Sequence, residues 1–537
     1  MMKTQNLGPF LGINNRLPDF ALHVDQKGDY LSAADNVDID NTGRIRRRQG
    51  VALVQALTGA HSLYLTSDTA GYLVRASVLY AITLPVYAET VVTALSSNAT
   101  MSYAELGSEL YYSNGTDSGR VAGSVAKPWA LPTPPAPVVS AIDGGSLWAG
   151  EYLVATSYCC WDGVSLLEEG GRSPLTRIER TTTGGLRVTL PGAATGATHV
   201  NIYLSNTSGS VLYLLAKVTA STATYDVAAL PTGREAGQRV EAPLPAGALF
   251  VHNGRLCSFS GSTVSVGLPF RPGYYAPVEG FIPFPEPVSI AVSAQTGVFV
   301  AADKTYWIPG DLGDVQGAII DVLPFGAVPG TAFADPNSSN VGWFSSNGVV
   351  IGTIQGSVST PMADAIDLTA PASGNSAVFT TLGCNRVVSC GWCLNLDTGA
   401  ATTYSGWDFT GISRGYGIAP GGIYRFVEDG AVDASVGFGR LNFGTDSPKR
   451  LPAAYASVSS TECMELVIAY ADGDGNDLEY PFLARSSSPQ IGPHRFDLAR
   501  GMLASLFDIT LRNPEGGAFT LASISFDHFT SQRRIFS

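Results

Sequence analysis

Apolar residues along the chain stand in short alternating runs separated by turn residues, and they almost never recur at helical spacing. This two-residue period, bounded by glycine, asparagine and proline, is typical of β-strands joined by tight turns. Asn-Gly and Asp-x-Gly between apolar pairs are strong hairpin signals. Residues 499–507 are the best helical candidate, and that segment is short. The pattern predicts an all-β protein.

One motif, an apolar strand followed by a glycine-containing turn and a second apolar strand, recurs along the chain. Its copies are Leu63–Val74, Glu109–Gly115, Leu249–Leu256, Gly297–Ala302, Trp343–Val350 and Leu394–Gly399. Successive anchor glycines, at 71, 115, 254, 297, 348 and 399, are 43, 44 or 51 residues apart, except for the 139 residues between 115 and 254. Blades of β-propellers repeat at about 40–50 residues. The spacing therefore predicts a propeller of six or seven blades.

The long interval between the second and third anchors predicts an inserted domain. An immunoglobulin-like sandwich needs about 100 residues, which fits the interval after one blade period is subtracted. Prolines border the segment on both sides, in Pro128–Pro137 and in Pro243–Pro245. From about Pro448 the expected strands lengthen, which predicts a second β-sandwich.

The predicted fold is an all-β chain: a β-propeller with an inserted immunoglobulin/fibronectin-like β-sandwich and a C-terminal β-sandwich. Each blade buries its faces against its neighbours, so a closed ring exposes few strand edges. We expect an N-terminal extended segment leading into the propeller (1–50), a first propeller segment (51–131), the insert (132–245), a second propeller segment (246–446) and the C-terminal sandwich (447–537).

The composition is that of a globular chain with ample core, because 45% of its 537 residues are hydrophobic and 14% are charged. A net charge of −13 argues against tight nucleic-acid binding, which needs basic patches. An acidic surface suits a channel along which DNA slides without sticking, and simple solubility is the alternative interpretation. The first residues lack an apolar signal region, and no stretch approaches the roughly 20 apolar residues of a membrane helix. We therefore expect synthesis in the cytoplasm and no membrane span.

Three clustered cysteines are the first candidate for chemistry. Cys390 and Cys393 have C-x-x-C spacing, and Cys384 lies close by. A metal would need a fourth ligand, and no histidine is near in sequence. A redox pair normally opens a helix, which this pattern does not predict. We therefore expect buried strand thiols, with a metal or redox site as the alternative.

Two short motifs match known sites imperfectly. Gly411–Gly415 has the G-x-S-x-G pattern of a nucleophile elbow, but the residues after it cannot start a helix, so we interpret it as a chance match. Asp472, Asp474 and Asn476 resemble the start of a calcium loop that lacks the later glycine and glutamate. An acidic hairpin turn is expected there, with a weak cation site as the alternative.

Carboxylates and tryptophans provide a possible sugar site. Adjacent residues such as Glu168 and Glu169 rarely flank a glycosidic bond, so we interpret them as a solvated loop. Trp161, Trp343, Trp392 and Trp407 are expected in the core, with carbohydrate binding as the alternative. We predict no catalytic, cofactor-binding or metal-binding residue and no enzyme activity.

The segment Asn36–Gly50 is the most distinctive portion of the sequence. An acidic extended half turns at residues 41–43 into a basic half that carries Arg44, Arg46, Arg47 and Arg48. These arginines can bind phosphates, pair with the preceding aspartates or contact a neighbouring subunit. We predict that they are assembly contacts.

Two N-terminal stretches, Gly12–Asp19 and Asn36–Gly50, resemble the N-terminal segment of tailed-bacteriophage tail proteins of the nozzle or tail-tip kind. The insert resembles the fibronectin-type module common in phage tail proteins, through Tyr152–Tyr158, Gly171–Pro174 and Thr224–Asp226. The C-terminal Asn513–Gly517, with Arg533 and Arg534 after it, resembles the closing domain of the same class.

This resemblance implies a structural component of the virion tail, at its distal end, that contributes to the DNA-ejection channel or to its attachment platform. The implied partners are further copies of the chain in a ring-like homo-oligomer and other tail proteins. Phage DNA would pass without specific binding, and no cofactor is implied. A receptor-binding tail protein that contacts the host cell surface is the first alternative, and a glycan-degrading tail enzyme is the second.

Overall fold

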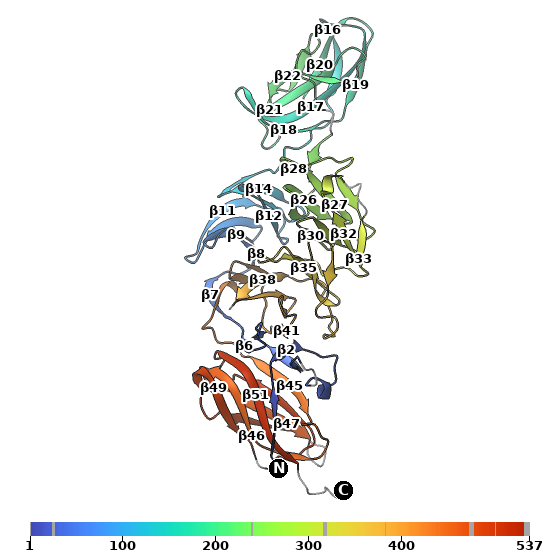
Figure 1. The fold of residues 1–537 in the computed structure, drawn as a ribbon. Helices are drawn as coiled ribbons and strands as arrows, with labels where there is room; N and C mark the ends of the chain where they lie inside the picture. Colours follow the sequence, from blue (N-terminus) through green and yellow to red (C-terminus); the bar gives the residue numbers. More distant parts are fainter. Residues whose placement is uncertain are drawn as a thin grey trace.

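The structure is a computed structural model that describes residues 2–23, 27–237, 240–314, 319–381, 383–471, 477–499 and 501–530. It has three tiers along one axis, with the insert at one end, the propeller in the middle and the C-terminal sandwich at the other end (Figure 1). Among the described residues the helices are two single 3-10 turns, η1 (Asp19–Ala21) and η2 (Leu312–Asp314). The predicted all-β propeller fold is confirmed, whereas the helix expected near 499–507 is absent from the described residues 501–507.

In the described part of the chain the propeller has seven blades, the upper of the two predicted numbers. Blades one to three are β8–β11 (Ala60–Leu65, Ala70–Arg75, Val78–Thr83, Ala88–Ala94), β12–β15 (Ser102–Leu106, Glu109–Ser113, Ser118–Ala122, Val125–Lys127) and β25–β27 with β29 (Ala248–His252, Arg255–Ser260, Thr263–Leu268, Phe281–Pro283). Blades four to six are β30–β33 (Ile290–Ala294, Gly297–Ala301, Thr305–Pro309, Ile320–Leu323), β34–β37 (Phe333–Ala334, Val341–Ser345, Gly348–Gly352, Val358–Ser359) and β38–β41 (Ser376–Thr381, Cys384–Ser389, Trp392–Asn395, Ala401–Thr403).

An early strand closes the ring. The seventh blade comprises β42 (Gly411–Ser413), β43 (Tyr416–Ala419) and β44 (Gly422–Val427), and its fourth strand is β7 (Gly50–Ala56) from near the N-terminus. Strand β7 pairs antiparallel with β44, while the next strand in sequence, β8, packs against β42 and β43. Both ends of the propeller sequence thus share one blade, which ties the ring together at its seam.

The insert is a sandwich of two sheets. One sheet has the order β16–β20–β23 (Val138–Leu147, Gly184–Thr189, Thr224–Val227). The other has the order β18–β17–β21–β22, with β19 also paired to β17 (Ser165–Arg172, Gly150–Asp162, His199–Ser205, Leu212–Thr219, Thr176–Arg180). Inward residues of both sheets, including Tyr152, Leu186 and Ile202, form one buried core, as expected for alternating strands that bury one face.

The C-terminal sandwich takes strands from both ends of the chain. Its first sheet has the order β49–β46–β51–β6–β5, with β1 on β51 (Ser488–Asp497, Lys449–Ser460, Phe519–Thr530, Ile45–Arg47, Val37–Ile39, Lys3–Leu7). Its second sheet contains β4, β45, β50, β47 and β48 (Ala33–Asp35, Ser435–Leu441, Phe507–Arg512, Glu465–Ala471, Asp477–Leu483). A short parallel pair, β2 (Phe10–Ile13) with β3 (Asp29–Leu31), lies beside them.

Two expectations about this region change. Residues 1–50 do more than lead into the propeller, because β1, β4, β5 and β6 are strands of the sandwich. Strand β45 also belongs to the sandwich, although it precedes the expected boundary at 447. Local strand pattern cannot reveal either fact, since both depend on pairing between segments that lie far apart in the sequence.

Candidate functional site

Two of the four predicted contact arginines are engaged within the chain. The Arg48 side chain is buried, donates to the Asn36 side-chain oxygen at 2.7 Å and lies 5.2 Å from the centroid of the Tyr404 ring. The Arg47 guanidinium donates to the carbonyl oxygens of Gly430 and Glu428. These contacts fix the N-terminal segment against the last two blades, so both guanidinium groups are bonded within the chain.

The other two arginines are more accessible. Arg46 lies 3.4 Å from an Asp40 carboxylate oxygen, which agrees with the self-pairing alternative. Arg44 is exposed, and its side chain forms no ion pair among the described residues. Assembly through this segment stays a prediction, and Arg44 is the arginine best placed for it.

A buried polar cluster joins β5 to blade six. One carboxylate oxygen of Asp38 accepts a hydrogen bond from the Tyr404 hydroxyl at 2.5 Å and lies 3.5 Å from Arg386 Nε. The Cys393 thiol is 3.6 Å from the same oxygen, and burial raises its pKa. Cys384 and Cys393 are therefore buried strand thiols, as expected, whereas Cys390 is only half-buried and lies on the turn between β39 and β40. No group of three metal-ligating side chains converges among the described residues.

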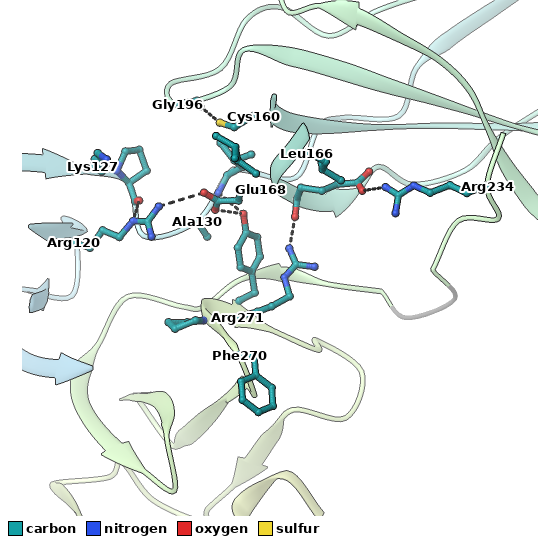
Figure 2. Close-up of a pocket in the computed structure, with 16 residues that line it drawn as sticks. Arg120, Lys127, Ala130, Cys160, Leu166, Glu168, Gly196, Arg234, Phe270 and Arg271 are labelled. Atoms are coloured by element: carbon teal, nitrogen blue, oxygen red, sulfur yellow. Dashed lines mark hydrogen bonds and ion pairs between the residues drawn. The ribbon is translucent and has the colours of Figure 1, made fainter. Parts of the chain in front are cut away.

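A polar cleft with a volume of about 860 Å³ lies between the insert and the propeller (Figure 2). It is bounded by β18 of the insert, by the linker after β15 and by β28 (Arg271–Tyr275), which extends the third blade toward the insert. Glu168 on β18 accepts from the Tyr274 hydroxyl at 2.7 Å and from Arg120 at 3.3 Å. This carboxylate thus connects the insert to two blades.

The neighbouring carboxylate, Glu169, is paired on every side. It accepts hydrogen bonds from Ser157 at 2.6 Å, from Asn201 at 3.0 Å and from the Tyr203 hydroxyl, and Arg234 lies 2.7 Å away. Burial alone would raise the pKa of Glu169, but these hydrogen bonds and the Arg234 charge together lower it below its ordinary value. The group is therefore held as an anion.

Two glycines let the insert approach its linker. A Cβ atom on Gly171 would lie 1.9 Å from the carbonyl oxygen of Glu241, and one on Gly170 would lie 3.1 Å from the Leu131 side chain. Only glycine fits this close approach of backbones. The Arg271 guanidinium crosses the same contact, donating to the Glu169 carbonyl and to the Glu241 carboxylate.

The expectation of a solvated loop at Glu168 and Glu169 is wrong. Both residues lie on strand β18: the Glu168 carboxylate and the Glu169 backbone carbonyl accept hydrogen bonds from the propeller, whereas the Glu169 carboxylate pairs within the insert. A general acid needs a raised pKa, whereas Glu169 has a lowered one and both carboxylates are paired with arginines. The signal present in the sequence is the run Glu-Glu-Gly-Gly, in which charge precedes the residues that permit close approach.

The remaining sequence motifs lie in strands, in the core or outside the described residues. Ser413 ends strand β42 and accepts from the Leu65 amide at 3.0 Å, and a strand rather than a helix follows it, which confirms the chance match. Trp343 is fully buried, as expected, whereas Trp161, Trp392 and Trp407 are only half-buried, and Trp407 stacks on Phe426. Asp472, Asp474 and Asn476 lie outside the described residues, as do Arg533 and Arg534. No helix in the described portion of the chain is long and apolar enough to cross a membrane.

Comparisons with known proteins extend only to the fold. No protein-family model matches the chain, and no curated sequence does. Similar solved structures include the WD40 β-propeller domain of Doa1 (10% identity, 63% of this chain and 93% of that chain, TM-score 0.25) and YCF48 bound to D1 peptide (10%, 71% and 98%, TM-score 0.25). An exo-β-1,3-galactanase from Phanerochaete chrysosporium is also similar (11%, 88% and 100%, TM-score 0.17). Scores this low carry no argument about activity.

Proposed function

We propose that this chain is a structural component of a bacteriophage virion tail, placed at the distal end within the DNA-ejection channel or its attachment platform. The resemblance of its N-terminal segment to nozzle and tail-tip proteins motivates this assignment. The proposed partners are further copies of the chain in a ring and other tail proteins. Assembly would take place in the host cytoplasm.

The observation that carries the proposal is a nine-stranded sheet that runs from blade six through β4 into the C-terminal sandwich. One hydrophobic core spans the same junction and contains Val387 of blade six together with Phe438 and Phe526 of the sandwich. Force along the axis would therefore be shared by backbone hydrogen bonds and packed side chains rather than by a flexible linker. A rigid body of this kind suits a mechanical role during attachment and ejection.

The charge of the chain fits passage of DNA. A net charge of −13 repels the phosphate backbone, which favours sliding over binding. The proposal requires acidic side chains on the surface that faces the channel in the assembled ring. A ring whose channel is lined by neutral or basic side chains would contradict this aspect of the proposal.

Electron microscopy of intact particles is the direct test. Virions purified from a culture that produces the chain should contain it by mass spectrometry, and cryo-electron microscopy should place several copies around the distal tail axis. Absence from gradient-purified particles, or a position in the capsid, would overturn the proposal. The copy number read from the map also gives the ring symmetry.

A second candidate, host attachment by the insert, has one observation in its favour. The insert stands at the free end of the molecule (Figure 1). Its Trp148 side chain, between β16 and β17, is 70% exposed. Large exposed aromatic side chains are enriched at recognition surfaces. Virions that assemble without residues 137–243 but no longer adsorb would favour this candidate. The third candidate, glycan degradation, gains nothing from Glu168 and Glu169, since both are paired in the junction.

A further inference from the structure

A second cavity, about 530 Å³ in volume, lies on the side of the C-terminal sandwich. It lies between β1, the segment that contains η1, and the end of β45 with the turn after it. Among the described residues its polar lining is basic or neutral, with no aspartate or glutamate: Lys3, Thr4, Gln5, Asn6, His23, Arg440, Asn442 and His528. The chain as a whole is acidic, with 45 acidic and 32 basic residues, so the charge of this lining is opposite in sign to that of the chain.

The positive potential extends behind the cavity wall. Lys449 is fully buried, and its ammonium group donates to the carbonyl oxygens of Ser447 at 2.8 Å and Ser505 at 3.1 Å, with no carboxylate at hydrogen-bond distance among the described residues. Burial lowers the pKa of His528, and the charges of Lys449 and Lys3 act in the same direction. Arg440 forms a long ion pair with the Asp19 carboxylate at 4.0 Å, and His23 lies 3.1 Å from an Asp29 carboxylate oxygen, so part of the positive charge is already compensated.

One wall residue has an unsatisfied ring nitrogen. His528 is 4% exposed and packs against the Phe443 ring with centroids 4.9 Å apart. Its Nδ1 atom is buried and has no hydrogen-bond partner in the described portion of the chain. Buried polar atoms are nearly always paired, so the Nδ1 atom of this wall residue is available for a hydrogen bond to a ligand.

We propose that this cavity binds a compact oxyanion, a phosphate-type or carboxylate group. Arg440 and Lys3 supply charged donors at the mouth, and the His528 ring forms the inner wall. Arginine suits this role because its planar fork of N–H donors matches the geometry of two anionic oxygens. The site is independent of the proposed function, because it rests only on side chains of the sandwich.

Isothermal titration calorimetry of the full-length protein tests the site. Sodium sulfate represents the phosphate-type anion and sodium succinate the carboxylate, each against sodium chloride of equal ionic strength. We expect saturable binding of at least one probe. The probe that binds shows whether the ligand is a phosphate-type group or a carboxylate. Loss of one charged donor in Arg440→Gln should weaken that binding about tenfold.

Variants separate binding from folding. Lys3→Gln and Arg440→Gln change exposed side chains, so melting should stay near that of the unchanged protein while affinity falls. Arg512→Gln, in the same sandwich but outside the cavity, should bind as the unchanged protein does. His528→Gln should also weaken binding, and the His528 ring signal in NMR spectra should shift on titration. Binding of neither probe, or equal binding by Arg440→Gln, would overturn the proposal. Either result would do so even if electron microscopy places the chain in the virion tail.

Discussion

The propeller joins its two neighbouring domains in different ways. At the C-terminal sandwich a continuous sheet and a shared hydrophobic core cross the junction, and the ion pair of Asp38 with Arg386 is buried there. At the insert the contact is a polar cleft crossed by hydrogen bonds and by the half-exposed ion pair of Glu168 with Arg120. The stabilisation from burying apolar surface depends little on salt or pH, whereas salt and pH weaken exposed charge pairs. One junction therefore makes a rigid body, and the other makes a joint whose strength depends on conditions.

The largest expected effect is at the buried ion pair. Asp38→Ala leaves the Arg386 charge buried without its carboxylate partner, because both side chains are nearly inaccessible. Breaking a buried pair from one side costs about 3–5 kcal/mol. Urea unfolding followed by tryptophan fluorescence should show this loss in the transition of the propeller and C-terminal sandwich. Arg187→Gln, which breaks an exposed pair in the insert, is the matched control and should leave that transition in place.

A smaller effect is expected from crowding the insert junction. Gly171→Ala places a methyl group 1.9 Å from the Glu241 carbonyl, so the docked contact must open or shift. Overpacking of this kind costs about 1–3 kcal/mol. We expect a larger radius of gyration in small-angle X-ray scattering and faster proteolysis of residues 132–137, with the rest of the chain unchanged.

The insert supplies its own control for that experiment. Gly192→Ala changes a glycine with nothing within 4 Å of the added atom among the described residues, so scattering and proteolysis should match those of the unchanged protein. Equal behaviour of the two variants would show that the backbone approach at Gly171 does not hold the insert in place.

The comparison also separates what sequence can predict from what it cannot. Hairpin glycines reveal the blade period because the turns require left-handed backbone, as at Gly254 and Gly348, whose φ angles are +72° and +82°. They do not show which two strands of a blade each turn connects. Gly254 lies between the first and second strands of its blade, whereas Gly399 lies between the third and fourth. The glycine spacing leaves six and seven blades open, because the fourth strand of the last blade, β7, comes from the other end of the propeller sequence.

The candidate site is harder to predict than the fold. Glu168 and Glu169 are visible as a charged pair, but their partners Arg120, Arg234 and Tyr274 lie far away in sequence. Strand alternation predicts which residues face a core, not which polar side chains meet across a junction. Arg47 and Arg48 show the same limit, because they donate to carbonyl oxygens of Gly430 and Ser405, on turns far downstream in the sequence.

Acid should destabilise the insert before it affects the rest, because the partners of the Glu169 carboxylate (Ser157, Asn201, Tyr203 and Arg234) all belong to the insert. The pKa of Glu169 is lowered in the folded chain from its ordinary value of 4.5, so its contribution to the stability of the insert is complete above pH 4.5 and is lost as pH falls through the lower folded value. The unfolding transition of the insert in urea should therefore move to lower urea concentration as pH falls below 4.5. Glu169→Gln should remove most of that dependence. An insert whose stability does not change in acid would show that the Glu169 charge does not stabilise it.

The smallest effect on stability is expected at Arg44. Its side chain is exposed and forms no ion pair among the described residues, so Arg44→Glu should leave the melting temperature of the isolated chain nearly unchanged. The same reversal of charge should weaken association between copies if this turn is a subunit contact, and analytical ultracentrifugation measures that association. Arg46→Glu is the comparison, because it also breaks the pair with Asp40 and should lower the melting temperature slightly. Unchanged association in Arg44→Glu would remove this turn from the assembly interface and leave Arg47 and Arg48 as internal contacts of the rigid junction.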